Sequence, residues 1–344
     1  MTKSRELSDY ANKQTTKNII INGNFDIWQR GTSLIAGTGT RYLSDRWGNE
    51  SVGTTIIPTR ESIILGDIQN AKYFHRSVVT SVVGTGNYAS LLTGIEDVST
   101  HAGNTITLSF YAKADVPKNI ASDLRQEFGT GGTPSTTVTG IGVTTHALTT
   151  NWQKFTTTIN IPSIAGKMIG TNNDNFLQLV FWFESGSDND ARTNALGQQS
   201  GIFDIAQVQI ESGGIASDFD LRSFGIELSL CQRYYEKSYD ENIAIGSVVT
   251  DGFPYLSSQP NTALVQFQSP VYATPKRIFP TRTVYSTITP NTPNTVTEND
   301  SGGSNRTALG ITQGNTKLFG TVIHSALNGG AFRYIYHWTA DAEF

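Results

Sequence analysis

The chain contains little cysteine and little charge. Cys231 is the only cysteine in 344 residues, which excludes an intrachain disulfide framework and a thiolate-rich metal site. Charged residues make up 16% of the chain, well below the roughly 25% of an average soluble protein. No segment approaches the roughly 20 apolar residues of a membrane span, so we expect no membrane insertion. This neutral composition, rich in hydroxyl groups and glycine, is typical of extracellular and viral β-proteins.

Basic clusters and a secretory signal are missing as well. The formal net charge is -4 and the basic residues are scattered, so the sequence lacks the electrostatic footprint of a nucleic-acid-binding protein. The segment Met1–Leu7 leads into polar sequence without the apolar region of a secretory signal. We therefore expect synthesis in a cytoplasm and no nucleic-acid partner.

Catalytic motifs are also absent. The sequence has no G-x-S-x-G, H-E-x-x-H or phosphate-binding G-x-x-x-x-G-K-[ST] motif, and its five histidines show no metal-ligand spacing. Two acidic pairs, Glu96 with Asp97 and Asp218 with Asp220, have the residue types of a glycosidase. Acidic pairs are common in loops, so we predict that the protein is not an enzyme.

Strand patterns fill residues 18–220. Apolar residues alternate in Thr105–Tyr111 and Lys154–Ile161, which predicts strands with one buried face. Residues 179–183 are apolar throughout and predict a central strand covered on both faces. Two further strands are expected at the ends of this region, in Asn18–Gly31 and Phe203–Glu211, and we expect them to lie side by side. The pattern predicts one β-sandwich.

The remaining residues divide into three parts. Residues 1–17 have too little apolar surface to fold alone and are expected to form an anchoring arm. In residues 221–238, apolar side chains at helical spacing predict a linking helix, namely Phe224, Leu228, Cys231 and Tyr235. Residues 239–344 return to strand patterns, the surest being Ala263–Phe267 and Ala331–Trp338. Between these strands, Thr287–Thr307 has the composition of a long exposed loop.

Several sequence blocks, in the same order, are similar to those of bacteriophage tail-fibre and minor virion proteins. The blocks are Phe25–Gly31, Tyr42–Trp47, Ser109–Ala114, Phe128–Ser135, Thr150–Phe155, Phe203–Glu211, Leu230–Tyr235 and Tyr336–Glu343. The chain thus resembles virion proteins with a jelly-roll sandwich like that of carbohydrate-binding modules. The resemblance implies an all-β protein in which the sandwich is followed by a short helix and a smaller C-terminal β-domain.

The resemblance also implies partners and a location. It implies a place in the virion, on the tail or the particle surface, with residues 1–17 docked to other virion proteins. It implies a homotrimer and, for a tail-fibre or receptor-binding protein, contact with host surface glycans. We expect exposed tips at Gly129–Pro134 and Thr287–Thr307 to meet the host surface or a neighbouring protein. Two alternatives remain: a capsid or baseplate decoration protein that cements subunits without binding glycans, and a polysaccharide depolymerase.

Calcium is the one cofactor that the resemblance implies. Asn22–Asp26 and Asp204 resemble the positions that hold a structural calcium in such jelly rolls, where carboxylates and backbone carbonyls supply oxygen ligands. Asp26 and Asp204 are the candidate ligands. The alternative is that Asn22 and Gly23 form a turn and the two aspartates cap local backbone amides.

A second candidate site is an aromatic ladder near the C-terminus. Phe332, Tyr334, Tyr336 and Trp338 share the same parity, so one strand would place all four rings on one face. Such a face suits stacking against a sugar. The alternative is a hydrophobic core or a subunit interface, since aromatic side chains dominate both.

Overall fold

The computed structural model describes two compact units. It describes residues 17–249, 255–257, 270–298, 304–312, 314–324 and 333–344. The first unit comprises residues up to Asp26 and Thr32–Phe224, and the second comprises Ile27–Gly31 and Gly225–Phe344. The chain therefore enters the second unit early, returns to the first, and enters the second again at Gly225.

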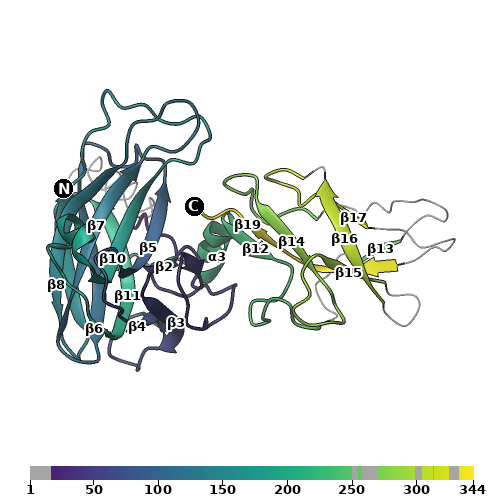
Figure 1. Cartoon of the computed structure of the whole chain (residues 1–344), viewed down its shortest axis with the longest axis horizontal. Helices are drawn as coiled ribbons and strands as arrows, with labels where there is room; N and C mark the ends of the chain where they lie inside the picture. The colour runs from purple at the N-terminus through teal and green to yellow at the C-terminus, as the bar shows by residue number, and fades with distance from the viewer. Residues whose placement is uncertain (1–16, 250–254, 258–269, 299–303, 313, 325–332) are drawn as a thin grey trace, which may run out of the picture. The chain divides into compact units, whose positions relative to one another are not determined.

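The first unit contains two antiparallel sheets (Figure 1). The six-stranded sheet has the order β1 (Arg41–Tyr42), β2 (Gly48–Val52), β5 (Tyr88–Glu96), β10 (Phe176–Ser185), β7 (Lys118–Glu127) and β8 (Val138–Leu148). The five-stranded sheet has the order β3 (Thr55–Ser62), β4 (Tyr73–Thr80), β11 (Gly201–Ser212), β6 (Thr105–Ala114) and β9 (Gln153–Asn160).

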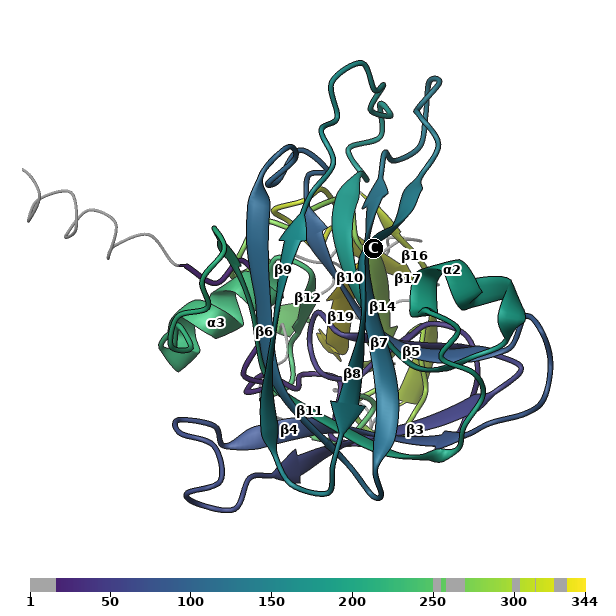
Figure 2. The same ribbon diagram turned by 90° about the vertical axis from the view of Figure 1, so that its left-hand side faces the viewer.

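The strand order is that of a jelly roll. Among the eight consecutive strands β4 to β11, the first, eighth, third and sixth form one sheet, and the second, seventh, fourth and fifth form the other. This arrangement is the double Greek key of jelly-roll sandwiches. The two sheets lie face to face in Figure 2. The predicted all-β jelly-roll fold is therefore confirmed.

Aromatic side chains from both sheets fill the core of the sandwich. Phe110 of β6 meets Phe181 of β10 with ring centroids 4.7 Å apart, and Phe183 stacks on Phe203 of β11 at 5.0 Å. The opposite face of β10 carries Trp182, which is buried in a second cluster. As the apolar run predicted, β10 is covered on both faces.

The two ends of the sandwich sequence lie side by side, as predicted. The Ile19 amide donates to the Ile210 carbonyl at 3.0 Å, and the Val208 amide donates to the Gly23 carbonyl at 2.8 Å. Gly23 is required here, since an added Cβ would lie 2.1 Å from the Val208 carbonyl oxygen. Residues 18–31 nevertheless form turns and no strand, so that part of the prediction was wrong.

The short helices and the remaining strands complete the fold. In the first unit, η1 (Ser187–Asn189) and α2 (Asp190–Thr193) follow β10. The helix α3 (Phe224–Gln232) lies in the second unit from Gly225 onward. One sheet of this unit contains β12 (Tyr235–Lys237), β19 (His337–Asp341) and β14 (Thr281–Tyr285). Its other sheet contains β13 (Tyr255–Ser257), β18 (Arg333–Ile335), β15 (Thr295–Glu298), β16 (Ser304–Thr312) and β17 (Thr321–His324).

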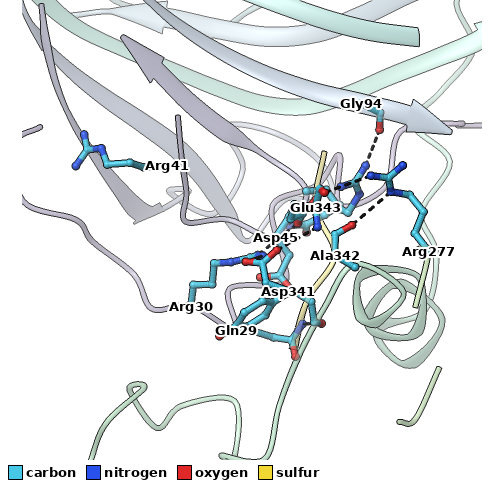
Figure 3. Close-up of polar contacts among 12 residues, drawn as sticks. Gln29, Arg30, Arg41, Asp45, Gly94, Arg277, Asp341, Ala342 and Glu343 are labelled. Atoms are coloured by element: carbon cyan, nitrogen blue, oxygen red, sulfur yellow. Dashed lines mark hydrogen bonds and ion pairs between the residues drawn. The ribbon is translucent and has the colours of Figure 1, made fainter. Parts of the chain in front are cut away.

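Arg30 contributes several of the contacts that hold the early segment Ile27–Gly31 in the second unit. Its guanidinium forms ion pairs with Asp341 at 3.1 Å and Glu343 at 3.4 Å (Figure 3). The same guanidinium lies over the ring of Tyr235, 3.7 Å from the centroid. The side-chain amide of Gln29 also donates to the Tyr235 carbonyl at 2.9 Å. These contacts attach a segment from the start of the chain to β12 and to the C-terminal residues.

Two predictions for the C-terminal part require correction. The linking helix was predicted over residues 221–238, but α3 spans only Phe224–Gln232 and Tyr235 begins β12. The exposed loop predicted at Thr287–Thr307 contains β15 and the start of β16 instead. Val296 is fully buried in β15, where three consecutive β-branched residues, Thr295–Thr297, favour a strand despite the neighbouring prolines.

Other predictions fall outside the described residues. These are the arm at residues 1–17, apart from Lys17, and the strand at Ala263–Phe267. In the part of the chain that is described, no helix has the length and apolar character needed to cross a membrane.

Candidate functional site

The outer face of the five-stranded sheet carries two half-buried aromatic rings. Phe110 points into the core, so its neighbour Tyr111 on β6 faces outward. Trp152 immediately precedes β9, the strand that pairs with β6. Neither ring is fully covered, and each lines a pocket of its own. We call these the Tyr111 pocket and the Trp152 pocket.

The Tyr111 pocket has a volume of about 160 Å³ and a mostly polar lining. Its floor includes Ser109 and Tyr111 of β6, and Lys154 lies directly opposite Tyr111 on β9. The remaining lining residues are Gln69, Asn70, Gln207, Asp218 and Phe219. Hydroxyl, amide, ammonium and carboxylate groups thus lie around two aromatic rings, Tyr111 and Phe219.

The Trp152 pocket lies next along the same strand. It has a volume of about 270 Å³ and is lined by Asp67, Lys113, Thr150, Asn151 and Trp152. Lys113 is two residues beyond Tyr111 on β6, which separates the two positions by about 6.8 Å along the strand. The pockets are therefore neighbours on one continuous face.

Packing fixes the indole of Trp152. Its ring meets Phe74 edge to face, with centroids 5.1 Å apart. The Lys113 ammonium lies 4.9 Å from the indole centroid and 3.8 Å from a carboxylate oxygen of Asp204. The ring is therefore held by two neighbours and needs little ordering when a ligand binds.

Hydrogen bonds also hold the loops that border the Tyr111 pocket. The side-chain amide of Gln207 donates to the Gln69 carbonyl at 2.7 Å, which fixes the β3–β4 loop. On the other side, Glu211 accepts hydrogen bonds from the amide and hydroxyl of Ser217, both at 2.7 Å. The loop that contains Asp218 is fixed by these bonds. The pocket is therefore preformed.

A bulge in β11 gives Gln207 its position. The register between β11 and β6 shifts between Ala206 and Gln209, and Gln207 has a φ of 44°. Asn70, also in the lining, has a φ of 60°. Left-handed backbone is costly for a residue such as glutamine, and bulges often redirect side chains next to functional sites. Gln207 and Asn70 thus have the left-handed backbone conformation that often occurs at functional sites.

An ion-pair network lies beside the Trp152 pocket. Arg76 donates to both carboxylate oxygens of Asp204, at 2.8 and 2.9 Å. Burial raises the pKa of the Asp204 carboxyl, and the hydrogen bonds from Arg76 oppose that rise. The same bonds raise the pKa of Arg76. The lining of the two pockets contains two lysines and two aspartates, so the face as a whole carries no excess charge.

The predicted calcium ligands do not form a metal site in this geometry. Asp204 does not fit, because its carboxylate already binds Arg76 and faces Lys113. Asp26 accepts a hydrogen bond from the side chain of Asn24 at 2.8 Å. Among the described residues, no group of three His, Cys, Asp or Glu side chains is placed to hold a metal ion. Calcium binding itself stays a prediction, which the melting temperature with calcium and with chelator tests.

The predicted aromatic ladder is part of a core where the structure describes it. Tyr336 is fully buried and Trp338 is 5% exposed, both in the core of the second unit. The backbone of Tyr334 lies in β18, and Phe332 falls outside the described residues. The two described rings do share one side, but Phe319 and Tyr272 cover it. A sugar-stacking role for Tyr336 and Trp338 was therefore wrong.

In the two acidic pairs, Asp97 and Asp220 accept hydrogen bonds from backbone amides, one within a turn and one from a distant segment. Asp97 accepts a hydrogen bond from the Ser99 amide at 2.9 Å. Asp220 accepts one from the Lys17 amide at 2.8 Å. Asp218 lines the Tyr111 pocket as its one carboxylate. These roles are those of turn and loop residues.

The residues of the two pockets were not predicted as site residues. Three of the resemblance blocks nevertheless meet here: Ser109–Ala114, Thr150–Phe155 and Phe203–Glu211 contribute Tyr111, Trp152 and Gln207. Their convergence depends on pairing between distant strands, which a single sequence does not reveal. The one signal in the sequence for this site was an aromatic residue, Trp152, at the boundary of a predicted strand.

Comparisons with known proteins give matches only among solved structures. No protein-family model and no curated protein matches the chain significantly. A structure described as "CBM4 structure and function" is 18% identical, with a TM-score of 0.32, and the match covers 56% of this chain and 98% of that one. The family 11 carbohydrate-binding module from Clostridium thermocellum is 13% identical, with a TM-score of 0.33 and coverages of 53% and 99%.

A phage protein is also among the matches. The enzymatically active domain of bacteriophage CBA120 tailspike protein 4 is 15% identical, with a TM-score of 0.34, and the match covers 57% of this chain and 21% of that chain. At such low identities and TM-scores these likenesses carry no functional argument. The jelly-roll assignment rests on the strand order itself.

Proposed function

We propose that the protein is a non-catalytic glycan-binding component of a bacteriophage particle, and that the face with the Tyr111 and Trp152 pockets is its binding surface. The observation that carries the proposal is the pair of half-buried rings set among fixed hydroxyl, amide and charged groups. Pyranose rings present an apolar face together with hydroxyl groups, and such a mixed lining binds both.

The charge of the face favours a neutral glycan. Lys113 and Lys154 are balanced by Asp67 and Asp218 within the two linings. Lys113 also pairs with Asp204. An anionic polymer would meet no net attraction here, whereas the hydroxyl groups of a neutral sugar find donors and acceptors.

The place of the protein in the virion rests on the sequence resemblance. A tail-fibre or receptor-binding role would use residues 1–17 for docking to other virion proteins and a homotrimer for presentation. Purified protein that competes with phage for adsorption to host cells would support this role. Absence of competition would favour the cement alternative, and a strict monomer in light scattering would reject the trimer.

Glycan binding is tested with matched variants on a glycan array. Tyr111→Ala and Trp152→Ala are expected to weaken binding at least about tenfold, which corresponds to about 1.4 kcal/mol. Tyr88→Ala is the control, because Tyr88 is a half-buried aromatic residue in a strand of the other sheet. Unchanged binding by both pocket variants, or equal loss in the control, would contradict the proposed face.

A further inference from the structure

A separate pocket lies within the second unit, between β14 and β16. Its volume is about 460 Å³, which falls within the range of about 300–1,000 Å³ typical of ligand sites. The lining consists of Phe279, Pro280, Thr281, Arg282, Val284, Asn294, Ala308, Gly310 and Ile311. Nothing in the proposed glycan-binding face uses these residues.

The floor of this pocket is apolar and continuous with the core. Val284 is fully buried, and the partly buried Ala308 and Ile311 pack against the same core cluster. At the rim, Phe279 is 55% exposed. A bulge in β16 falls between Ala308 and Gly310, and a Cβ added at Gly310 would meet no atom within 4 Å. The space above Gly310 is therefore open to a ligand.

Among the described residues of the lining, Arg282 carries the only positive charge. Its guanidinium donates to the Phe319 carbonyl and, at 3.1 Å, to the Ile311 carbonyl. It also lies over the Phe279 ring, 4.6 Å from the centroid. A guanidinium has five N–H donors, so donors remain for a ligand after these two bonds.

No carboxylate of the described residues neutralises Arg282. The ion pairs found in that part of the chain involve other cations. Burial lowers the pKa of Arg282, while the hydroxyl of Tyr272 raises it. A partly buried cation without a counter-charge is costly, and an anion in the pocket would relieve that cost.

Polar groups stand at the rim. Thr281 is exposed and contributes a hydroxyl. The main chain of Asn294 is fixed by bonds from its amide to the Val284 carbonyl at 2.7 Å and from the Ala308 amide to its own carbonyl at 2.8 Å. Asn294 is exposed and lines the pocket, so its side chain is available to a ligand as a donor and acceptor.

We propose that this pocket binds a carboxylated sugar unit. The carboxylate would pair with Arg282, the apolar face of the ring would lie against Phe279 and the floor, and the hydroxyl groups would meet Thr281 and Asn294. A planar carboxylate matches the fork of a single guanidinium. Phosphate carries more charge than a carboxylate, and Arg282 is the one cation among the described residues of the lining.

In the test, the full chain is titrated with sodium glucuronate as the probe. Calorimetry or saturation-transfer NMR measures the binding. Glucose, acetate and inorganic phosphate are titrated in parallel. Glucuronate is expected to bind with a Kd of about 1 mM or below and at least about tenfold more tightly than glucose or acetate. Equal binding of glucose would show that the charge is irrelevant, and equal binding of acetate or phosphate would show a general anion site. Either result, or no binding of glucuronate, overturns the proposal.

Two variants test whether glucuronate binds in this pocket. Arg282→Gln and Gly310→Leu should each weaken glucuronate binding at least about tenfold. Gly310→Leu fills the open space and leaves Arg282 in place, so it decides the outcome if Arg282→Gln fails to fold. Gly225→Leu is its control, since a Cβ at Gly225 also meets no atom within 4 Å and Gly225 is outside the lining. Wild-type affinity in Gly310→Leu, or loss in Gly225→Leu, would contradict the site.

The same variants separate this inference from the proposed glycan face. Gly310→Leu should leave array binding to neutral glycans unchanged, and Trp152→Ala should leave glucuronate binding unchanged. Loss of both activities in Gly310→Leu would contradict a separate site in the second unit.

Discussion

Trp152 in the first unit and Trp338 in the second show opposite uses of an aromatic residue near a strand. Trp152 is half-buried, touches Phe74 on one side and lines a pocket on the other. Trp338 is 5% exposed, and its ring is surrounded by Tyr272 and Phe319, at centroid distances of 5.7 and 5.1 Å. Residue type and alternation assign a ring to a face, but remote segments decide whether that face is covered.

Truncation of the two tryptophans should give the largest effect, and the loss of stability should differ strongly between the two variants. Trp338→Ala is expected to lower the free energy of unfolding of the second unit by about 3–5 kcal/mol, because it leaves a cavity in a core. Trp152→Ala should lower that of the first unit by about 1 kcal/mol or less, since the ring is partly solvated. Chemical denaturation with separate probes for each unit measures both. Similar losses in the two variants would contradict the assignment of Trp338 to a core and Trp152 to a surface.

The second largest effect should be a loss of stability of the first unit in acid. Burial lowers the pKa of His75 to about 3 and that of His146 to about 4. Between these values and the ordinary pKa near 6.5, the unfolded chain binds protons that the folded unit does not, so stability falls as the pH falls. From about pH 6 to about pH 5 the two histidines together should cost about 2 kcal/mol.

Thermal unfolding at a series of pH values measures this dependence. His146→Gln removes one of the two titrating groups and should halve the contribution of the histidines. The glutamine can retain a hydrogen bond to Ser122, which lies 2.8 Å from Nε2 of His146. An unchanged pH slope in this variant would mean that His146 is accessible to protons in the folded state.

Gly23→Ala should disturb the pairing of the two ends of the sandwich. The new methyl group would collide with the Val208 carbonyl oxygen, which would be 2.1 Å away. Overpacking of this kind typically costs about 1–3 kcal/mol. Gly214→Ala is the control, because its Cβ would meet only the Thr158 methyl group at 3.8 Å. Equal melting temperatures for the two variants would indicate that residues 18–24 do not lie against β11.

Arg30→Gln should have the smallest effect, confined to the second unit. It removes the ion pairs to Asp341 and Glu343 and the contact with the Tyr235 ring. The Arg30 side chain is 8% exposed, Asp341 is 42% exposed and Glu343 is 4% exposed, so solvent screens the pair with Asp341 more than the pair with Glu343. We expect a loss of about 1 kcal/mol in the second unit and none in the first. Arg30→Lys retains the charge and should recover part of the loss.

Much of the sandwich was predictable because its strands carry local signals. The alternation of Ile106, Leu108 and Phe110 identified a strand and its buried face, and both β6 and the core packing agree. The position of Gln207 was not predictable, because it depends on a bulge and on a bond to Gln69 that spans 138 residues. Long-range register of this kind leaves no trace in a single sequence.

The predicted sugar-binding role of the aromatic ladder was wrong for a related reason. Parity correctly placed Tyr336 and Trp338 on one side, but it contained no information about what covers that side. Tyr272 and Phe319, which do so, precede them by many residues in segments with weak strand patterns. The strand at Thr295–Glu298 was missed because the surrounding proline and asparagine residues dominated the pattern.

The most direct measurement of the proposed binding face uses the indole N–H signals of the five tryptophans. The protein, labelled with ¹⁵N-tryptophan, is titrated with the glycan that binds most strongly on the array, and signals are assigned by Trp152→Phe and Trp338→Phe variants. We predict that the Trp152 signal shifts progressively while the Trp338 signal stays in place. A shift of Trp338 with an unchanged Trp152 would contradict it.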